Sequence, residues 1–331
     1  MLNAPKNESF VDKIIKSAIA VKYNVPARHE FRTSSLPYCP IHDLQDQILD
    51  EMGEDSYSKN FYTLIGTQVH ENVQNMCGMG ELGGFVFGSW ECPECHKKYS
   101  MCFRPTKCEC GHHLLNYVEV AYNYKGLSGH QDMMACYPVD SKGKFLNLKG
   151  KDRRKFCKAI EKDYNSEKVA HRWCGFEYKT TGTQYLFNKN MQKYLPYPKH
   201  FGQIEAYCVM ANLLYNIKFD EYSIIYISRE CPEKHGTYYF KSFLYDWTPE
   251  KYEYRLETIE RACKNRHYVE KYMSTEDVKW IKKCIKNRPC IGQKSWETYM
   301  KKHYFANEEC PYLKLCISNK LTAKRVLKDC E

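Results

Sequence analysis

Two closely spaced pairs of cysteines have the clearest metal-binding chemistry in this chain. Cys92 and Cys95 are separated by two residues, and 12 residues later Cys108 and Cys110 are separated by one. Thiolate pairs with such spacing are typical of tetrahedral Zn²⁺ sites in zinc ribbons. The four cysteines therefore predict a zinc site.

The chain has 18 cysteines among 331 residues. Because the N-terminal residues lack the apolar core of a secretory signal, we expect a cytoplasmic protein with reduced thiols that bind metals or pack in the core. Cys102 or His112 could replace one thiolate of the predicted zinc site. No apolar run approaches the roughly 18 residues of a membrane span, so no membrane partner is expected.

Glu177 and Lys179 form the second candidate site. They lie two residues apart in segment 175–180, which has strand character, so their side chains share one face of the strand. A carboxylate there can bind a divalent cation, and the neighbouring ammonium can orient a water molecule or offset charge on a phosphate. An isolated Glu-x-Lys sequence is more often a surface ion pair.

Other polar residues accompany that pair. Asp132 follows Gly129 in an apolar strand, where a carboxylate needs a partner such as a metal ion, a backbone amide or an arginine. His70 lies on an expected helix, and Gln203 and Tyr207 are four residues apart on one face of another. Considered singly, ordinary helix surfaces explain the histidine and the Gln–Tyr pair.

In this order the motifs resemble the PD-(D/E)XK nuclease superfamily, in particular its RecB-like branch, which includes CRISPR-associated exonucleases and the AddB nuclease domain. That branch carries a Gly-x-x-x-His helix, a Gly-x-x-Asp strand, a Glu-x-Lys strand and a Gln-x-x-x-Tyr helix. The matching segments here are Gly66–His70, Gly129–Asp132, Glu177–Lys179 and Gln203–Tyr207. The resemblance extends from about Ser34 to Cys316.

The resemblance implies a role for each motif. Lys179 would position the attacking water and stabilise the transition state, while Gln203 and Tyr207 would orient the lysine or the DNA backbone. A divalent cation would lower the pKa of bound water and neutralise charge on the scissile phosphate. The ligands of this Mg²⁺ or Mn²⁺ would be His70, Asp132, Glu177 and the backbone carbonyl of Tyr178.

Cysteines outside the zinc pairs resemble the iron–sulfur branch of the same family. Cys310 and Cys316, separated by five residues, match its last two ligands. The resemblance implies a [4Fe–4S] cluster that ties the C-terminal tail to the N-terminal region. Buried thiols or a zinc site would also explain Cys310 and Cys316, because sequence does not separate these metals. The four implied ligands are Cys39, Cys290, Cys310 and Cys316, with Cys284 as the alternative to Cys290.

The net charge of +10 is concentrated in two segments. Residues 141–170 contain 10 basic and 4 acidic residues, a balance of +6, and residues 281–331 contain 12 and 5, a balance of +7. The remainder therefore carries −3. Such segments fit a polyanion such as DNA, although a solvated lysine-rich face would have the same composition. Asp132 and Glu177 are further apart than the family pattern, and we interpret residues 138–170 as a basic insertion that contacts DNA phosphates.

Hydrophobic spacing predicts the elements that position these residues. Together with the resemblance, they predict an α/β protein with a restriction-endonuclease-like core, in which helices flank a central mixed sheet. We expect one elaborated nuclease domain over residues 1–331, with a zinc-ribbon insertion at 85–116 and a cysteine-bearing tail at 281–331. Helices are expected at 11–23, from Ser34, and at 61–76, 201–215 and 250–273, and strands at 117–124, 127–136, 173–180, 222–228 and 237–245.

The sequence thus predicts a divalent-metal-dependent deoxyribonuclease, and the resemblance favours an exonuclease on single-stranded DNA ends. Recombination, repair or replication in a phage or mobile element is the expected setting, with a recombination or replication protein as a candidate partner. One alternative is a catalytically silent DNA-binding or scaffold protein with the same fold. Another is a zinc-ribbon accessory factor whose function depends on Cys92 and Cys95 but not on Glu177.

Overall fold

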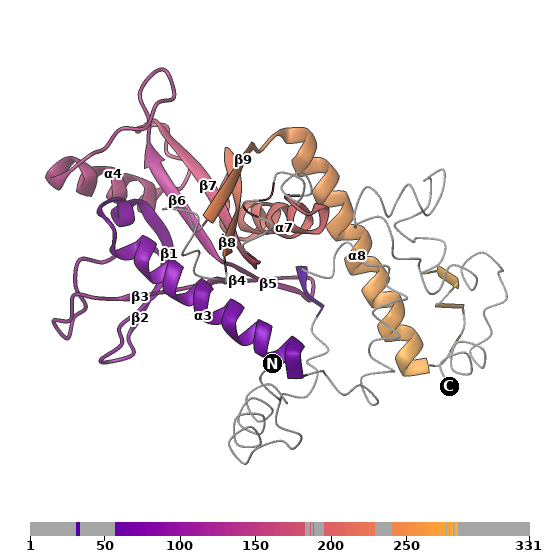
Figure 1. Ribbon diagram of the computed structural model, residues 1–331. Helices are drawn as coiled ribbons and strands as arrows, with labels where there is room; N and C mark the ends of the chain where they lie inside the picture. The colour runs from indigo at the N-terminus through magenta and orange to yellow at the C-terminus, as the bar shows by residue number, and fades with distance from the viewer. Residues whose placement is uncertain are drawn as a thin grey trace, which may run out of the picture.

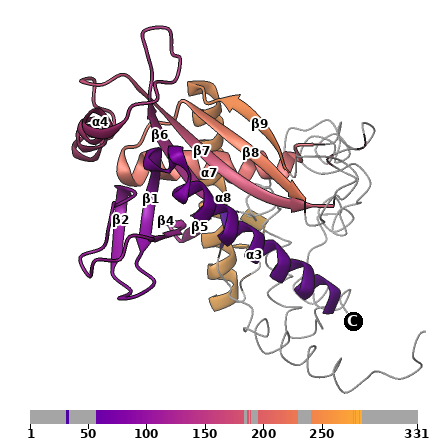
Figure 2. The same ribbon diagram turned by 60° about the vertical axis from the view of Figure 1, so that its left-hand side comes forward.

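The computed structural model describes residues 31–33, 57–182, 186, 188, 195–228, 240–275, 277, 279–280 and 282–283. A central sheet carries helix α3 on one face and helices α7 and α8 on the other (Figure 1); Figure 2 shows the same layers from another side. This is the mixed α/β architecture that the sequence predicts. The helices predicted at 11–23 and from Ser34, and the tail beyond Lys283, lie outside the described residues.

The central sheet is mixed. Its strand order is β2-β1-β6-β7-β8-β9, and β3 also pairs with β1. Strands β7 and β8 run parallel and are joined through helix α7, since a parallel pair requires a crossover connection. The other described pairs of this sheet are antiparallel. The strands are β1 (Val86–Glu91), β2 (Lys98–Phe103), β3 (Asn116–Val118), β6 (Met133–Pro138), β7 (His171–Thr181), β8 (Glu221–Ser228) and β9 (Phe240–Asp246).

Two strands predicted as continuous are each interrupted at a carboxylate. The segment 117–124 is divided at Glu119 into β3 and β4 (Val120–Tyr124), and the segment 127–136 is divided at Asp132 into β5 (Leu127–Gln131) and β6. Strands β4 and β5 pair with each other in a separate sheet, whereas β3 and β6 both pair with β1. The prediction of two unbroken strands was wrong because the pairing partner changes at each carboxylate.

The helices at 61–76, 201–215 and 250–273 are confirmed as α3 (Tyr57–Met79), α7 (Pro198–Tyr215) and α8 (Pro249–Thr275). Helix α7 begins at Pro198, which needs no amide partner in the first turn. It ends at Asn216, which adopts the left-handed conformation with φ 58°. Helix α4 (Gly150–Lys162) was not predicted and lies in the basic segment between β6 and β7.

Two apolar clusters hold the helices on the sheet. On the α7 side, Trp173 and Ile204 are fully buried in the larger cluster. On the α3 side, Val69, Val73 and Cys77 pack against the second cluster, which contains Trp90, Met133 and Tyr178. The three α3 residues are four apart, so they form one stripe of the helix toward the sheet.

A buried ion pair joins α7 to α8. Arg255 donates from Nε and Nη2 to Oε2 of Glu205, at 3.1 and 2.6 Å, and the hydroxyl of Tyr222 donates to Oε1 at 2.8 Å. Both charged residues are buried. Loss of either partner would leave the other charge without compensation in a site that water does not reach.

We therefore expect Arg255→Met to lower the free energy of unfolding by about 3–5 kcal/mol. The matched control is Arg261→Met, which breaks the exposed pair with Glu257 and should cost no more than about 0.5 kcal/mol. Urea unfolding followed by circular dichroism measures both values. Equal effects of the two substitutions would show that the buried pair does not couple α7 to α8.

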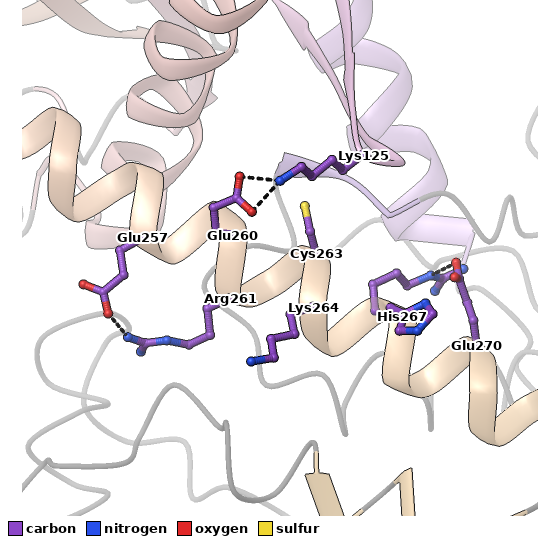
Figure 3. Close-up of a pocket in the computed structure, with 9 residues that line it drawn as sticks. Lys125, Glu257, Glu260, Arg261, Cys263, Lys264, His267 and Glu270 are labelled. Atoms are coloured by element: carbon purple, nitrogen blue, oxygen red, sulfur yellow. Dashed lines mark hydrogen bonds and ion pairs between the residues drawn. The ribbon is translucent and has the colours of Figure 1, made fainter.

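The turn between β4 and β5 also contacts α8. Lys125 donates to both carboxylate oxygens of Glu260, at 2.8 and 2.7 Å (Figure 3). Further along α8, Arg261 donates to Glu257 and Arg266 to Glu270. These residues line a surface cavity of about 710 Å³ in which the three carboxylates are each bonded to a cation.

Candidate functional site

Glu177 is a fully buried carboxylate on β7. Its Oε1 accepts a hydrogen bond from Lys179 Nζ, and its Oε2 has no hydrogen-bond partner among the described residues. Burial raises the pKa of Glu177 to about 8, although the charge of Lys179 opposes the shift. A buried carboxylate oxygen without a partner is a group that a bound cation would satisfy.

Lys179 is held by two acceptors. Besides Glu177, it donates to Oε1 of Gln203 at 3.1 Å, and Gln203 Nε2 donates to the hydroxyl of Tyr207 at 2.8 Å. Burial opposes the charged form of Lys179, but the carboxylates of Glu177 and Asp132 outweigh it and raise the pKa of the lysine. Tyr207 is buried, so its contacts fit the orientation of the lysine through Gln203 rather than contact with a DNA backbone.

Asp132 lies directly before β6, at the point where β7 has no neighbouring strand on the β6 side. Met133 is the first residue of β6 to pair with β7, opposite Phe176. One step beyond that pairing, Asp132 Oδ2 accepts the backbone N–H of Tyr178 at 2.6 Å. The carboxylate therefore replaces the missing strand as hydrogen-bond partner, and this fixes it beside Glu177 and Lys179.

His70 reaches the same place from α3. Its Nδ1 lies 3.7 Å from Asp132 Oδ1. Helix α3 approaches β7 closely at Gly66, where an added Cβ would lie 3.3 Å from Thr180 Oγ1. The structure thus brings together all the side chains predicted for the nuclease site, namely His70, Asp132, Glu177, Lys179, Gln203 and Tyr207.

Four cysteines form a separate cluster at the end of β1. The Sγ atoms of Cys92, Cys95, Cys108 and Cys110 all lie within 4.8 Å of one another. The Cys92–Cys110 and Cys95–Cys108 sulfur distances are 3.6 and 3.4 Å. Sulfurs around a tetrahedral Zn²⁺, at about 2.3 Å each, lie roughly 3.8 Å apart. The cluster could therefore hold a metal ion, and it includes neither Cys102 nor His112.

Two tight turns position these cysteines. In the first, His96 N donates to Cys92 O at 2.9 Å between β1 and β2. In the second, Gly111 N donates to Cys108 O at 2.9 Å between β2 and β3.

The hydroxyl of Tyr99 donates to Cys108 Sγ at 3.3 Å and, together with a backbone hydrogen bond from Cys110, lowers the pKa of that thiol to about 6. Hydrogen bonds with Cys108 and Cys110 raise the pKa of Cys95 to about 12. A thiol that ionises near neutral pH is a ready metal ligand.

Comparisons with known proteins add little to this geometry. No family model matches the chain, and no curated protein matches it. Among solved structures, the chain matches one described as "Crystal structure of SSO0001", with 10% sequence identity and a TM-score of 0.35. The match covers 77% of this chain and 87% of the other. A likeness this weak supports no conclusion about fold or function.

Glu119 is a candidate ligand that the sequence analysis missed. Val120 pairs with Gln131, so Glu119 and Asp132 occupy opposite positions at the open end of the β4–β5 hairpin, away from its turn. Gln74 Nε2 donates to Glu119 Oε1 at 3.1 Å, and burial and the charge of Asp132 both raise the pKa of Glu119. In sequence Glu119 has the appearance of one polar residue in an alternating strand. The register of the hairpin that turns at Lys125 and Gly126, which places Glu119 opposite Asp132, was the signal that could have found it.

A cavity of about 560 Å³ opens beside His70 and Glu119. Its walls come from α3, from the end of β3 and from His130 of β5. The lining includes Thr67, Gln74 and Asn116, which offer hydrogen-bonding groups to a polar ligand. Glu119 and His70 therefore lie next to a space that solvent or a ligand can occupy.

Gly129 allows α7 to approach β5. A Cβ at this position would lie 2.6 Å from Cε1 of Tyr207 and 2.8 Å from Cγ2 of Thr33. Both distances are too short for any side chain, and Tyr207 is buried and unable to retreat. The glycine of the Gly-x-x-Asp motif is therefore required for packing, whatever the chemistry of the site.

Gly129→Ala is expected to lower the free energy of unfolding by about 1–3 kcal/mol, because the methyl group overpacks the interface. The displaced Tyr207 should also release Gln203 from Lys179. Gly80→Ala is the control, since the nearest atoms to its added Cβ lie at 3.7 Å. Thermal unfolding of both variants gives the comparison, and an unshifted midpoint for Gly129→Ala would contradict the close approach.

The cysteines implied as iron–sulfur ligands cannot be placed in this geometry. Cys39, Cys290, Cys310 and Cys316, like the alternative Cys284, lie outside the described residues. Within the described part of the chain, no helix is long and apolar enough to cross a membrane.

Proposed function

We propose that this protein is a divalent-metal-dependent deoxyribonuclease, an exonuclease that prefers single-stranded ends and acts in recombination, repair or replication. The observation that carries the proposal is the environment of Glu177. This carboxylate is fully buried, has one oxygen without a partner among the described residues, and contacts a lysine that Gln203 also holds in place. A purely structural ion pair would not need an unsatisfied oxygen beside a second carboxylate.

The donor set fits a hard divalent cation. Asp132 and Glu177 supply carboxylate oxygens, His70 supplies an imidazole, and the backbone carbonyl of Tyr178 is the fourth donor of the resemblance. Oxygen-rich sets of this kind suit Mg²⁺ and Mn²⁺. When bound, such a cation lowers the pKa of water and stabilises charge on a phosphate.

Lys179 supplies the chemistry of the protein itself. An ammonium has three N–H donors, and Glu177 and Gln203 accept two of them. The third can hold the attacking water or donate to a non-bridging phosphate oxygen as negative charge develops there. Because its two other bonds fix the direction of the ammonium, this donor is oriented before the substrate arrives.

The single-strand preference and the DNA substrate rest on the resemblance to RecB-like nucleases. Aromatic residues make up 15% of the chain, and base stacking on aromatic side chains is common in proteins that bind single strands. For the cofactors, we propose Zn²⁺ at the four clustered cysteines and a [4Fe–4S] cluster at Cys39, Cys290, Cys310 and Cys316. The cytoplasm is the compartment that such reduced cysteines favour.

The direct test is a cleavage assay on end-labelled single- and double-stranded DNA. The protein, purified without oxygen, should degrade single strands from an end when Mg²⁺ or Mn²⁺ is present and not when EDTA is added. The product ladder reports the polarity. Folded, metal-loaded protein that binds DNA but never cleaves it would favour the catalytically silent DNA-binding alternative.

A further inference from the structure

Helix α4 presents a continuous basic stripe to solvent. Lys151, Arg154, Lys155, Lys158 and Lys162 are all exposed. Their spacing of three or four residues places them along one side of the helix, about 16 Å from end to end. The opposite side carries the buried Phe156 and Ile160. The stripe is therefore the outer surface of a helix whose inner surface is fixed to the protein.

The charges of this stripe are not compensated within the helix. None of the five makes a hydrogen bond or ion pair with another described residue, whereas Arg261 and Arg266 on α8 each bond a glutamate one turn away. Basic side chains three and four residues apart repel one another and destabilise a helix. A surface that served solubility alone would alternate charges, as α8 does, so the stripe points to a polyanionic partner.

The helix is firmly attached to the sheet that carries the candidate nuclease site. Glu161 Oε1 accepts the backbone N–H of Phe103 at the end of β2, at 3.0 Å. Cys157 Sγ donates to Gly84 O at 3.7 Å, and Lys149, just before α4, pairs with Glu81 at 3.0 Å. The stripe is thus a rigid surface with a fixed position relative to β6 and β7.

The stripe lacks the side chains that bind single strands. Proteins that hold single-stranded DNA combine basic residues with exposed aromatic rings on which bases stack. The aromatic residue of α4, Phe156, is buried on the inner side. A stripe of cations without aromatic rings can contact phosphates but cannot stack bases, and this suits the backbone of a duplex, whose bases are already stacked.

The sheet fixes the position of the stripe relative to the site. Asp132 precedes β6, and α4 packs to the side of that strand, where Phe156 lies against Phe85 just before β1 and against Phe103 of β2 (Figure 1). The stripe and the candidate site therefore belong to one framework.

We propose that α4 binds the phosphate backbone of a DNA duplex adjoining the single strand that the candidate site cleaves. This inference rests on the proposed function for the identity of the cleaved strand. The binding of duplex by α4 is independent of cleavage. The substrate is then a duplex with a single-stranded end rather than a free single strand.

The test is DNA binding as a function of salt, with EDTA present so that cleavage does not interfere. The variant is Lys151→Gln/Lys155→Gln/Lys158→Gln/Lys162→Gln, which keeps the helical propensity of each position. The control, Lys107→Gln/Lys218→Gln/Lys264→Gln/Lys271→Gln, removes the same charge from exposed lysines elsewhere. The probes are a 12-base-pair duplex with a single-stranded extension and a single strand of the same total length. Circular dichroism confirms that both variants are folded.

For the duplex probe, the α4 variant should bind at least about tenfold more weakly than the control and lose about 3 to 4 from the slope of log affinity against log salt. For the single strand, the two variants should differ by less than about twofold. Equal losses in variant and control, or equal losses on both probes, would overturn the proposal. If the two variants show this binding pattern but the wild-type protein never cleaves DNA with Mg²⁺, the nuclease function is refuted. The duplex-binding surface on α4 is then still established.

Discussion

Glu177→Gln is expected to abolish metal-dependent cleavage while leaving the protein folded. Glutamine has the size of glutamate but cannot offer an ionised oxygen to a divalent cation. We expect kcat/KM to fall by at least about a thousandfold, as when an essential group of a pre-organised site is removed. The assay uses end-labelled single-stranded DNA with Mg²⁺. A parallel calorimetric titration should show that Mn²⁺ binding at this site is lost as well.

The stability of this variant separates chemistry from folding. Because burial raises the pKa of Glu177 to about 8, from 4.5, the folded protein holds this proton more tightly than the unfolded chain. Between about pH 4.5 and 8, stability of the metal-free wild type is therefore lost as the pH rises. Glu177→Gln has no such proton, so its unfolding midpoint should depend less on pH in this range and should not be lower than that of the wild type at pH 8.

Two further variants complete the test of the site. Lys179→Gln should retain Mn²⁺ binding, because Glu177 and Asp132 remain, but should cleave at least about a hundredfold more slowly. Glu253→Gln, on the exposed surface of α8, should cleave at the wild-type rate. Wild-type activity in Glu177→Gln would show that Glu177 and Lys179 form a structural ion pair and that any cleavage occurs elsewhere.

Local sequence was sufficient for the chemistry-bearing residues because their spacing is local. Glu177 and Lys179 alternate on one strand, and Gln203 and Tyr207 are one helical turn apart, so each pair keeps its relation in any structure that forms that element. That the four motifs lie close together in the fold could be predicted only from the family resemblance. In the structure their approach depends on glycines at close contacts, such as Gly129 beneath Tyr207.

The sequence could not predict where a strand changes its pairing partner. Strand-forming residues continue on both sides of Glu119 and of Asp132, yet the strands leave one sheet for another at these positions. Strand pairing is decided by distant residues, here those of β1, and periodicity carries no information about them. Glu119 was missed although the register of the β4–β5 hairpin places it opposite Asp132. Helix α4 was missed because its high charge concealed the short apolar stripe of Phe156 and Ile160.

Strand β1 also connects the cysteine cluster to the central sheet. Residues 85–116 were predicted as an insertion, yet β1 of that segment pairs with β6 at Val86–Ala135 and Phe87–Met134. Strand β6 in turn begins directly after Asp132. A metal at the cysteines therefore stabilises a strand on which the position of the candidate nuclease site depends.

We expect the protein to contain one zinc per chain at this cluster, and Cys95→Ser/Cys108→Ser to contain none. Thiolates supply much of the binding free energy of structural zinc, and its loss should lower the unfolding midpoint by at least about 10 °C. Elemental analysis by mass spectrometry measures the metal, and calorimetry measures the midpoint. Cys102→Ala is the control, because Cys102 lies on β2 outside the cluster and burial raises its pKa to about 12.

The effect of zinc loss on the candidate nuclease site shows whether the cysteine cluster supports the central sheet or only its own hairpin. If β1 transmits the loss of metal to β6, the double variant should bind Mn²⁺ more weakly at Asp132 and Glu177, although neither residue lies in the cluster. If the cluster only stabilises its own hairpin, zinc will be lost while Mn²⁺ binding stays at the wild-type value. Retention of zinc by the double variant would instead contradict the assignment of these cysteines. The direct pairing of β1 with β6 favours weaker Mn²⁺ binding in the double variant. Strand β1 leads to the cysteine cluster and is itself part of the central sheet.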